Sequence, residues 1–157
     1  MRFVLIVVLL MSVLTIKAAP QTAKEPNPNT PRIADPVQFD EWGDISFCDE
    51  KARLDNAAIQ LRHDPNFIIY LVIFAGKTAC VGEARARGIR AKSYLVQKPG
   101  IRVQQVVWID GGYEDTVRTD VWIWPPNMEP PPAFPALKRN QVKLETNCRI
   151  KCRACHR

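Results

Sequence analysis

The sequence predicts an α+β fold, a two-layer β-α-β-α-β-β sandwich with two helices on one face of a mixed sheet. Two stretches with helical periodicity alternate with short β-branched and aromatic stretches. The most hydrophobic of these, residues 66–75, has the length of a buried strand. Only two prolines interrupt residues 37–124, which therefore hold the expected domain.

Residues 49–63 and 82–96 are the expected helices. In the first, apolar residues recur at i, i+3, i+4 and i+7, which places them on one buried stripe. Ser46 is expected to cap its start, and Pro65 to stop it. In the second, the inward positions are mostly small, including Gly88, and this favours close approach to the sheet.

The expected strands are residues 37–39, 66–75, 103–109 and 119–124. Gly111-Gly112 separates the last two and predicts a turn between them. Trp108, Trp122 and Trp124 lie on these strands and are expected in the core, although the last strand could expose Trp124 on one face.

The amino-terminal residues have the three parts of a secretory signal. Arg2 is followed by an apolar run and then by small residues before Pro20, which predicts cleavage after Ala18. The run is short for a membrane span, which takes about 20 residues, but an uncleaved anchor is the alternative. No later stretch is long enough to cross a bilayer. We therefore expect an exported protein with no integral span after signal cleavage.

Composition divides the chain into five zones. These are a signal peptide (1–18), a Pro-rich leader (19–36), the domain (37–124), a Pro-rich spacer (125–137) and a basic, Cys-rich tail (138–157). The tail holds seven Lys or Arg and one acid, Glu145. The positive charge thus lies on an appendage that we expect to be mobile, rather than on the folded body, and this argues against nucleic-acid binding.

Three groups of residues carry a resemblance to a known family. They are Phe39-Asp40 with Leu54-Asp55-x-x-Ala58-x-x-Leu61-x-x-x-Pro65, then Gly76-Lys77-Thr78-Ala79, then Arg87-Gly88-x-x-Ala91-x-x-Tyr94-Leu95 with Gly100-Ile101. Over about 85 residues, Phe39 to Ile123, the chain resembles the OmpA-like C-terminal domain, which binds peptidoglycan in the bacterial periplasm. It is also similar to exported bacterial proteins that have no established activity.

The resemblance implies a divergent, non-enzymatic envelope protein, periplasmic or associated with the outer membrane, with peptidoglycan or another envelope component as partner. In the family a carboxylate meets the amino group of diaminopimelate, and an arginine meets its carboxylate. Arg87 occupies the arginine position, but Ala79 occupies that of the acid. Asp40 and Asp44 could supply the acid instead. The alternatives are a solvated Arg87 and a fold that has lost its ligand.

The five cysteines are Cys48, Cys80, Cys148, Cys152 and Cys155. If the first two long strands are parallel, Cys48 and Cys80 lie at the same end of the sheet, where a disulfide is reachable. Two separate thiols are the alternative. The odd number leaves at least one cysteine without an intramolecular partner.

Cys152-Arg-Ala-Cys155-His156 has the spacing of a c-type haem attachment motif. A small exported electron-transfer protein with haem on its tail is therefore an alternative function, although the leading interpretation has no cofactor. Cys148, Cys152, Cys155 and His156 also have the ligand types of a zinc site. The third interpretation is an accidental motif in a disulfide-bearing tail. No catalytic set stands out, and the chain is not expected to be an enzyme.

Overall fold

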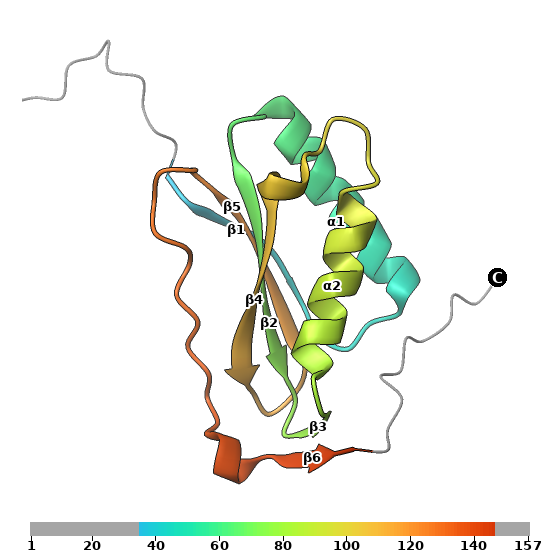
Figure 1. The fold of residues 1–157 in the computed structure, drawn as a ribbon, viewed down its shortest axis with the longest axis vertical. Helices are drawn as coiled ribbons and strands as arrows, with labels where there is room; N and C mark the ends of the chain where they lie inside the picture. The colour runs from blue at the N-terminus through green and yellow to red at the C-terminus, as the bar shows by residue number, and fades with distance from the viewer. Residues whose placement is uncertain (1–34, 147–157) are drawn as a thin grey trace, which may run out of the picture. The chain divides into compact units, whose positions relative to one another are not determined.

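The structure is a computed structural model that describes residues 35–146. It confirms the α+β class, with a four-stranded mixed sheet and two helices on one of its faces (Figure 1). The helices are α1 (Phe47–His63) and α2 (Glu83–Leu95). The strands of the main sheet are β1 (Val37–Trp42), β2 (Ile68–Ala75), β4 (Val106–Tyr113) and β5 (Arg118–Trp124). The predicted signal peptide, and the leader up to residue 34, lie outside the described residues.

The strand order brings two loops that are distant in sequence to one end of the sheet. The order is β1-β5-β2-β4, with β5 antiparallel to both β1 and β2, and β4 parallel to β2. β1 and β2 therefore run in the same direction, as expected, with β5 between them. Their carboxyl ends meet at the end of the sheet shown lowest in Figure 1.

The core lies between the sheet and the helices. The stripe predicted on α1 is buried, and β2 is buried along almost its whole length. On α2, Gly88 is in contact with the sheet, where an added Cβ would lie 2.6 Å from the Trp108 ring. A larger residue would have to push α2 away from β4, which explains the small residues predicted on this face.

The first helix begins at Phe47, two residues before the predicted start at residue 49. Ser46 is its N-cap, and its hydroxyl accepts a hydrogen bond from the Asp49 backbone N–H at 3.2 Å. The capping interaction was predicted correctly, but a cap precedes the first helical residue, so the helix starts directly after it.

The predicted Gly111-Gly112 turn is wrong, because both glycines lie inside β4. Pairing between β2 and β4 shifts by one residue at this point, so the two glycines belong to a bulge. An added Cβ on Gly111 would lie 2.7 Å from the Phe74 ring, and Gly112 has a φ of +87°. The start of this strand was also predicted too early, since Val103–Gln105 form a 3₁₀ turn, η1.

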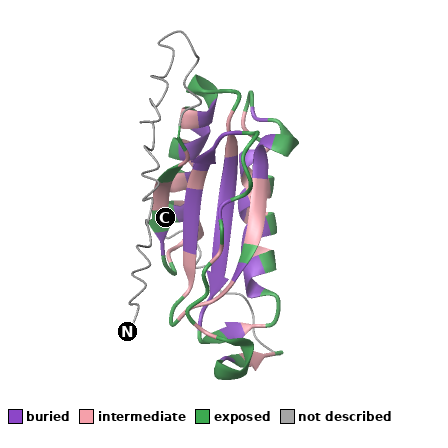
Figure 2. Cartoon of the chain, turned by 90° about the vertical axis from the view of Figure 1, so that its left-hand side faces the viewer, coloured by how far each residue is buried: buried purple, intermediate pink, exposed green. Residues whose placement is uncertain are grey.

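The predicted spacer and the start of the predicted tail are part of the folded unit. Residues 125–137 run along the sheet face opposite the helices (Figures 1 and 2), and the Leu137 N–H donates to the Tyr113 carbonyl at 3.0 Å. A 3₁₀ turn, η2 (Arg139–Gln141), leads into β6 (Lys143–Glu145), which pairs in parallel with β3 (Thr78–Cys80). The domain boundary predicted at residue 124 was therefore too early. Proline favours an extended path here, while Leu137 still has an N–H that can pair.

Candidate ligand site at the β3 rim

The carboxyl ends of β1 and β2, together with β3 and the start of α2, form what we call the β3 rim. Asp44 lies in the loop after β1, and Arg87 lies on α2, one turn after Glu83. Arg87 Nη2 donates to Asp44 Oδ1 at 2.8 Å and lies 2.9 Å from Glu83 Oε1. Arg87 Nε donates to the same Glu83 oxygen at 3.0 Å. The rim thus joins one arginine to two carboxylates.

The three side chains differ sharply in their exposure to solvent. Arg87 is 8% exposed and Glu83 is 9% exposed, whereas Asp44 is 50% exposed. Burial alone would lower the pKa of Arg87, but hydrogen bonds to Asp44 and Glu83 outweigh it, so the pKa lies above its ordinary value. Arg87 is therefore always positively charged, and its charge is neutralised by two carboxylates of the same chain. Asp44 is the member that meets solvent.

Glu83 ties the Asp44–Arg87–Glu83 group to the backbone, and a second ion pair lies nearby. Glu83 Oε2 accepts a hydrogen bond from the Cys80 backbone N–H at 3.2 Å, which ties α2 to β3. On the other side, buried Glu50 of α1 forms an ion pair with Arg90 of α2. Burial raises the pKa of Glu50, while Arg90 and Arg87 act to lower it. The ion pair between Glu50 and Arg90 joins the two helices, and Arg87 lies near enough to it to act on Glu50 electrostatically.

The structure brings only one of the two predicted substitute acids to Arg87. Asp40 accepts a hydrogen bond from Arg53 of α1 at 2.6 Å, so it belongs to a different ion pair. Ala79, where the resemblance would place the acid, is buried in β3 opposite Leu144 of β6. An acid placed there would be buried as well, so Asp44 is the better candidate for the acidic group.

Sequence analysis missed Glu83, although a signal was present. Glu83 and Arg87 are four residues apart on a helix, the spacing at which an acid and a base face each other. Glu83 also lies in the first turn of α2, where the helix dipole stabilises a negative charge. Both features indicate a bonded Arg87 rather than a solvated one.

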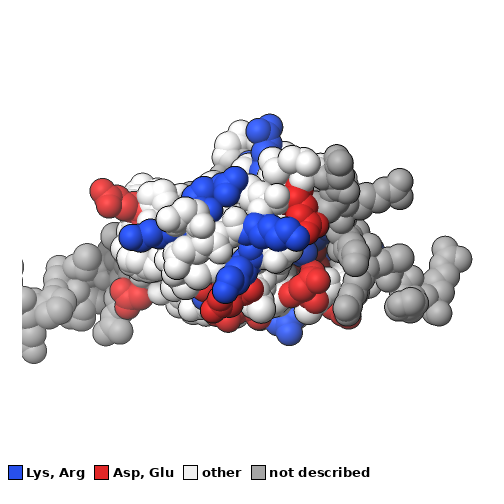
Figure 3. Space-filling view, turned by 90° about the horizontal axis from the view of Figure 1, so that it is seen from below, with Lys and Arg blue, Asp and Glu red and all other residues white. Residues whose placement is uncertain are grey.

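Charges of both signs are intermixed at this end of the molecule. Figure 3, seen from below, shows basic and acidic side chains side by side rather than a patch of one sign. Lys77, directly before β3, and Lys143, the first residue of β6, are both exposed, and the Lys143 N–H donates to the Lys77 carbonyl at 2.9 Å. Lys143 Nζ lies 3.3 Å from Glu145 Oε1. Such a surface suits a ligand that carries both charges better than it suits a polyanion.

Cys48 and Cys80 are both disulfide-bonded. Cys48 lies in the first turn of α1, and Cys80 ends β3. The Asp44–Arg87–Glu83 network connects the loop before Cys48 to the backbone of Cys80, so both cysteines belong to the β3 rim. That they are bonded to each other stays a prediction.

A second group of charged residues lies on the sheet face opposite the helices. Arg118 Nε lies 3.0 Å from Asp120 Oδ1, and its Nη1 lies 3.4 Å from Glu114 Oε1. The Arg118 guanidinium also lies over the Phe74 ring, 4.3 Å from the ring centroid. Burial raises the pKa of Asp120 above 3.8; Arg118 opposes this rise, and Glu41 and Glu114 add to it.

The raised pKa of Asp120 predicts a stability that falls as pH rises. The native state holds this proton more tightly than the unfolded state, so the contribution is complete below 3.8 and is lost as pH passes the raised pKa. We expect Asp120→Asn to remove this loss. Urea unfolding from about pH 3 to about pH 7 measures it as the difference between wild type and variant. Parallel curves for the two proteins would contradict the prediction.

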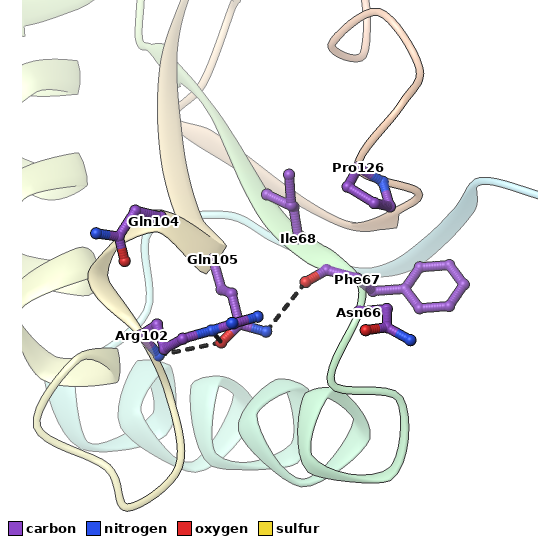
Figure 4. A pocket seen from close by; sticks show the side chains of 7 residues that line it. All are labelled: Asn66, Phe67, Ile68, Arg102, Gln104, Gln105 and Pro126. Atoms are coloured by element: carbon purple, nitrogen blue, oxygen red, sulfur yellow. Dashed lines mark hydrogen bonds between the residues drawn. The ribbon is translucent and has the colours of Figure 1, made fainter.

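A shallow pocket of about 270 Å³ lies at the opposite end of the sheet from the rim. Its lining side chains come from the start of β2, from η1 and from the segment after β5 (Figure 4). The Gln105 amide donates to the carbonyls of Pro65 and Phe67, at 2.7 and 3.3 Å, and its oxygen accepts from Arg102. These polar groups hold the loops together, so the pocket offers few of them to a ligand.

The haem and zinc motifs, Cys148, Cys152, Cys155 and His156, lie outside the described residues. Within residues 35–146, no group of three or more His, Cys, Asp or Glu is arranged to hold a metal ion. In the same range, no helix combines the length and the hydrophobicity that crossing a membrane requires.

Comparisons with protein families, with curated proteins and with solved structures found no match to this chain.

Proposed function

We propose that the chain is a non-enzymatic, exported envelope protein that associates with peptidoglycan through Asp44 at the β3 rim. The observation that carries the proposal is the position of Asp44, half exposed and held at 2.8 Å by buried Arg87. A carboxylate fixed in this way can receive an ammonium group without first losing side-chain freedom. The peptide stem of peptidoglycan presents such a group on diaminopimelate.

The charge balance of the rim supports a cation as the ligand group. Arg87 contributes one positive charge, and Asp44 and Glu83 contribute two negative ones, so the triad carries a net charge of −1. Arg87 has both Nε and Nη2 bonded to these carboxylates. In the proposed mode the ammonium meets Asp44, and the arginine positions Asp44 instead of gripping the ligand. This departs from the family pattern, in which the arginine meets the ligand's carboxylate.

Loss of ligand binding is the second candidate, and the low exposure of Arg87 favours it. A ligand carboxylate would have to displace Asp44 or Glu83 to form a paired contact with the guanidinium. Under this candidate the Asp44–Arg87–Glu83 network serves only the fold. The two candidates make different predictions for sedimentation with purified peptidoglycan.

Under the first candidate the wild-type protein should sediment with purified peptidoglycan, and Asp44→Asn should weaken binding. We expect a decrease of about fivefold to tenfold, below the full value of a charged hydrogen bond because Asp44 is half exposed. Asp115→Asn is the matched control, since Asp115 is an exposed acid in the β4–β5 turn near the rim. Wild-type protein that stays in the supernatant would favour the second candidate.

Peptidoglycan with lysine in place of diaminopimelate tests the mode of binding. Lysine keeps the side-chain ammonium group but lacks the additional carboxylate. If Asp44 is the recognition group, both kinds of peptidoglycan should bind with similar affinity. If Arg87 grips the ligand instead, only the diaminopimelate form should bind well, and Asp44→Asn should strengthen binding by releasing the guanidinium.

A further inference from the structure

One part of the sheet face opposite the helices is not covered by the Pro-rich segment. Residues 125–137 run over the β4 side of this face (Figure 2), where an added Cβ on Gly112 would lie 2.9 Å from Pro135. They also contact the end of β5, where Trp124 Nε1 donates to the Glu129 carbonyl at 2.8 Å. Trp124 is consequently buried, contrary to the exposure considered from the sequence. Trp122, two residues earlier, is partly exposed.

The pairing of β1 with β5 places polar side chains beside Trp122. Gln38 lies opposite Trp122, and Glu41 lies opposite Asp120. Residues three apart in a regular strand point to opposite faces, but the bulge between Gln38 and Asp40 brings Gln38 and Glu41 to the same one. The Gln38 amide donates to Glu41 Oε2 at 3.2 Å, which agrees with this placement. We call Gln38, Glu41, Asp120 and Trp122 the Trp122 strip.

The aromatic part of the strip is held in one orientation. The rings of Trp122 and Trp124 meet edge to face, with centroids 5.7 Å apart and an interplanar angle of 84°. Trp124 makes a second edge-to-face contact with Tyr70, at 6.3 Å. Because Trp124 is buried and hydrogen-bonded, its edge-to-face contact holds the neighbouring Trp122 ring in place.

The geometry points to a saccharide-binding surface at the Trp122 strip, with a neutral oligosaccharide as the ligand. A sugar ring has apolar C–H faces that pack on an aromatic ring, and an equatorial rim of hydroxyl groups that planar amides and carboxylates can bond. The strip supplies the ring from Trp122, and the amide and carboxylate from Gln38 and Glu41. Gln38 and Glu41 lie on the edge strand β1 and are both exposed, and Trp122 lies on the neighbouring strand β5.

The charges of the strip select a neutral sugar over an acidic one. Glu41 and Asp120 face each other across the β1–β5 pair, and Glu41 lies close enough to raise the pKa of Asp120. Arg118 is the cation paired with Asp120, and it also lies near Glu114. Glu41, Glu114 and Asp120 thus share one cation, so an acidic polysaccharide would meet a surplus of acidic groups here, whereas a neutral one carries no charge to be repelled.

The strip is independent of the β3 rim, because it shares no residue with it and takes a ligand of another class. The two can therefore be tested apart, with a hexamer of N-acetylglucosamine as a neutral probe that carries no peptide stem. We expect the full chain to bind this hexamer in calorimetry, and Trp122→Ala to weaken binding by about tenfold, the loss of one aromatic contact. Asp44→Asn should leave the affinity unchanged.

Two variants and one second probe make the result decisive. Phe134→Ala is the matched control, since Phe134 is 75% exposed on the Pro-rich segment and lies outside the strip. Gln38→Ala removes an exposed side chain without touching the core, so it tests the strip if Trp122→Ala fails to fold. A hexamer of galacturonic acid, which is negatively charged, should bind at least tenfold more weakly than the neutral hexamer.

Three results would overturn the assignment. The first is wild-type protein that does not bind the neutral hexamer at millimolar concentration. The second is an equal loss of affinity in Phe134→Ala and Trp122→Ala, which would indicate general aromatic adhesion. The third is a concentration-dependent dimer that Trp122→Ala dissociates, because the strip would then be covered by a second copy of the chain.

Discussion

Arg87→Met is expected to lower the free energy of unfolding by about 3–5 kcal/mol, the cost of removing one partner from a buried ion pair. Methionine keeps most of the apolar stem but leaves Glu83 buried without its cation. Glu83 would retain only the hydrogen bond from the Cys80 N–H. Urea unfolding of the wild type and the variant at neutral pH measures the difference.

Two further variants separate the loss of the ion pair from other effects of the substitution. Arg85→Met changes an exposed arginine on the same helix, and we expect a change within about 0.5 kcal/mol. The double variant Glu83→Gln with Arg87→Met should regain part of the loss, because the uncompensated charge is gone. A change below about 1 kcal/mol in Arg87→Met would contradict the prediction, because the pair of Arg87 with Glu83 would then contribute little to stability.

The elements that sequence analysis predicted correctly are those whose own residues determine them. α1 has a capping serine, a regular apolar stripe and a terminating proline within twenty residues, so nearly all its information is local. The β2 strand is buried on both faces. Its continuous apolar run is enough to predict this burial, whichever elements pack against the strand. The fold class followed because these elements alternate along the chain.

The elements that were missed depend on partners distant in sequence. β3 and β6 are three residues each, too short for a hydrophobic period, and they are stabilised by pairing across more than sixty residues of chain. The prolines of residues 125–137 suggested a spacer because extended, proline-rich chain is common in linkers. Whether such a chain packs on a sheet depends on the face it meets, here that of Trp124 and Gly112, which the segment's own composition does not reveal.

The candidate site was predicted in part. The topology brought Asp44 toward the end of the sheet near Arg87, as expected from parallel strands, but it did not bring Asp40 there. The sequence suggested that Arg87 either binds a ligand or is solvated. In the structure its guanidinium forms ion pairs with two carboxylates of the chain instead. The burial of an arginine depends on how two helices pack, so it cannot be predicted from a local sequence pattern. The Glu83–Arg87 spacing was the one local signal available.

The disulfide pairing of Cys48 with Cys80 is supported by what surrounds both residues. Each is disulfide-bonded, and a chain of contacts from Asp44 through Arg87 and Glu83 reaches the Cys80 backbone. Non-reducing peptide mapping should therefore recover one peptide pair that contains these two cysteines. A peptide joining either of them to Cys148, Cys152 or Cys155 would contradict the pairing.

Replacing Cys48 and Cys80 together by serine should lower the free energy of unfolding by about 3–4 kcal/mol, since the bridge closes a loop of 31 residues in the unfolded chain. Most of this loss is expected from the gain in entropy of the unfolded state, so the native β3 rim should keep its contacts. The wild type under reducing conditions should match the double variant in urea unfolding, and the double variant itself should not respond to the reductant. Cys148→Ser is the matched control, because it removes a cysteine outside the described residues and should leave the unfolding midpoint of the oxidised protein unchanged. A double variant as stable as the oxidised wild type would show that the bridge does not close this loop.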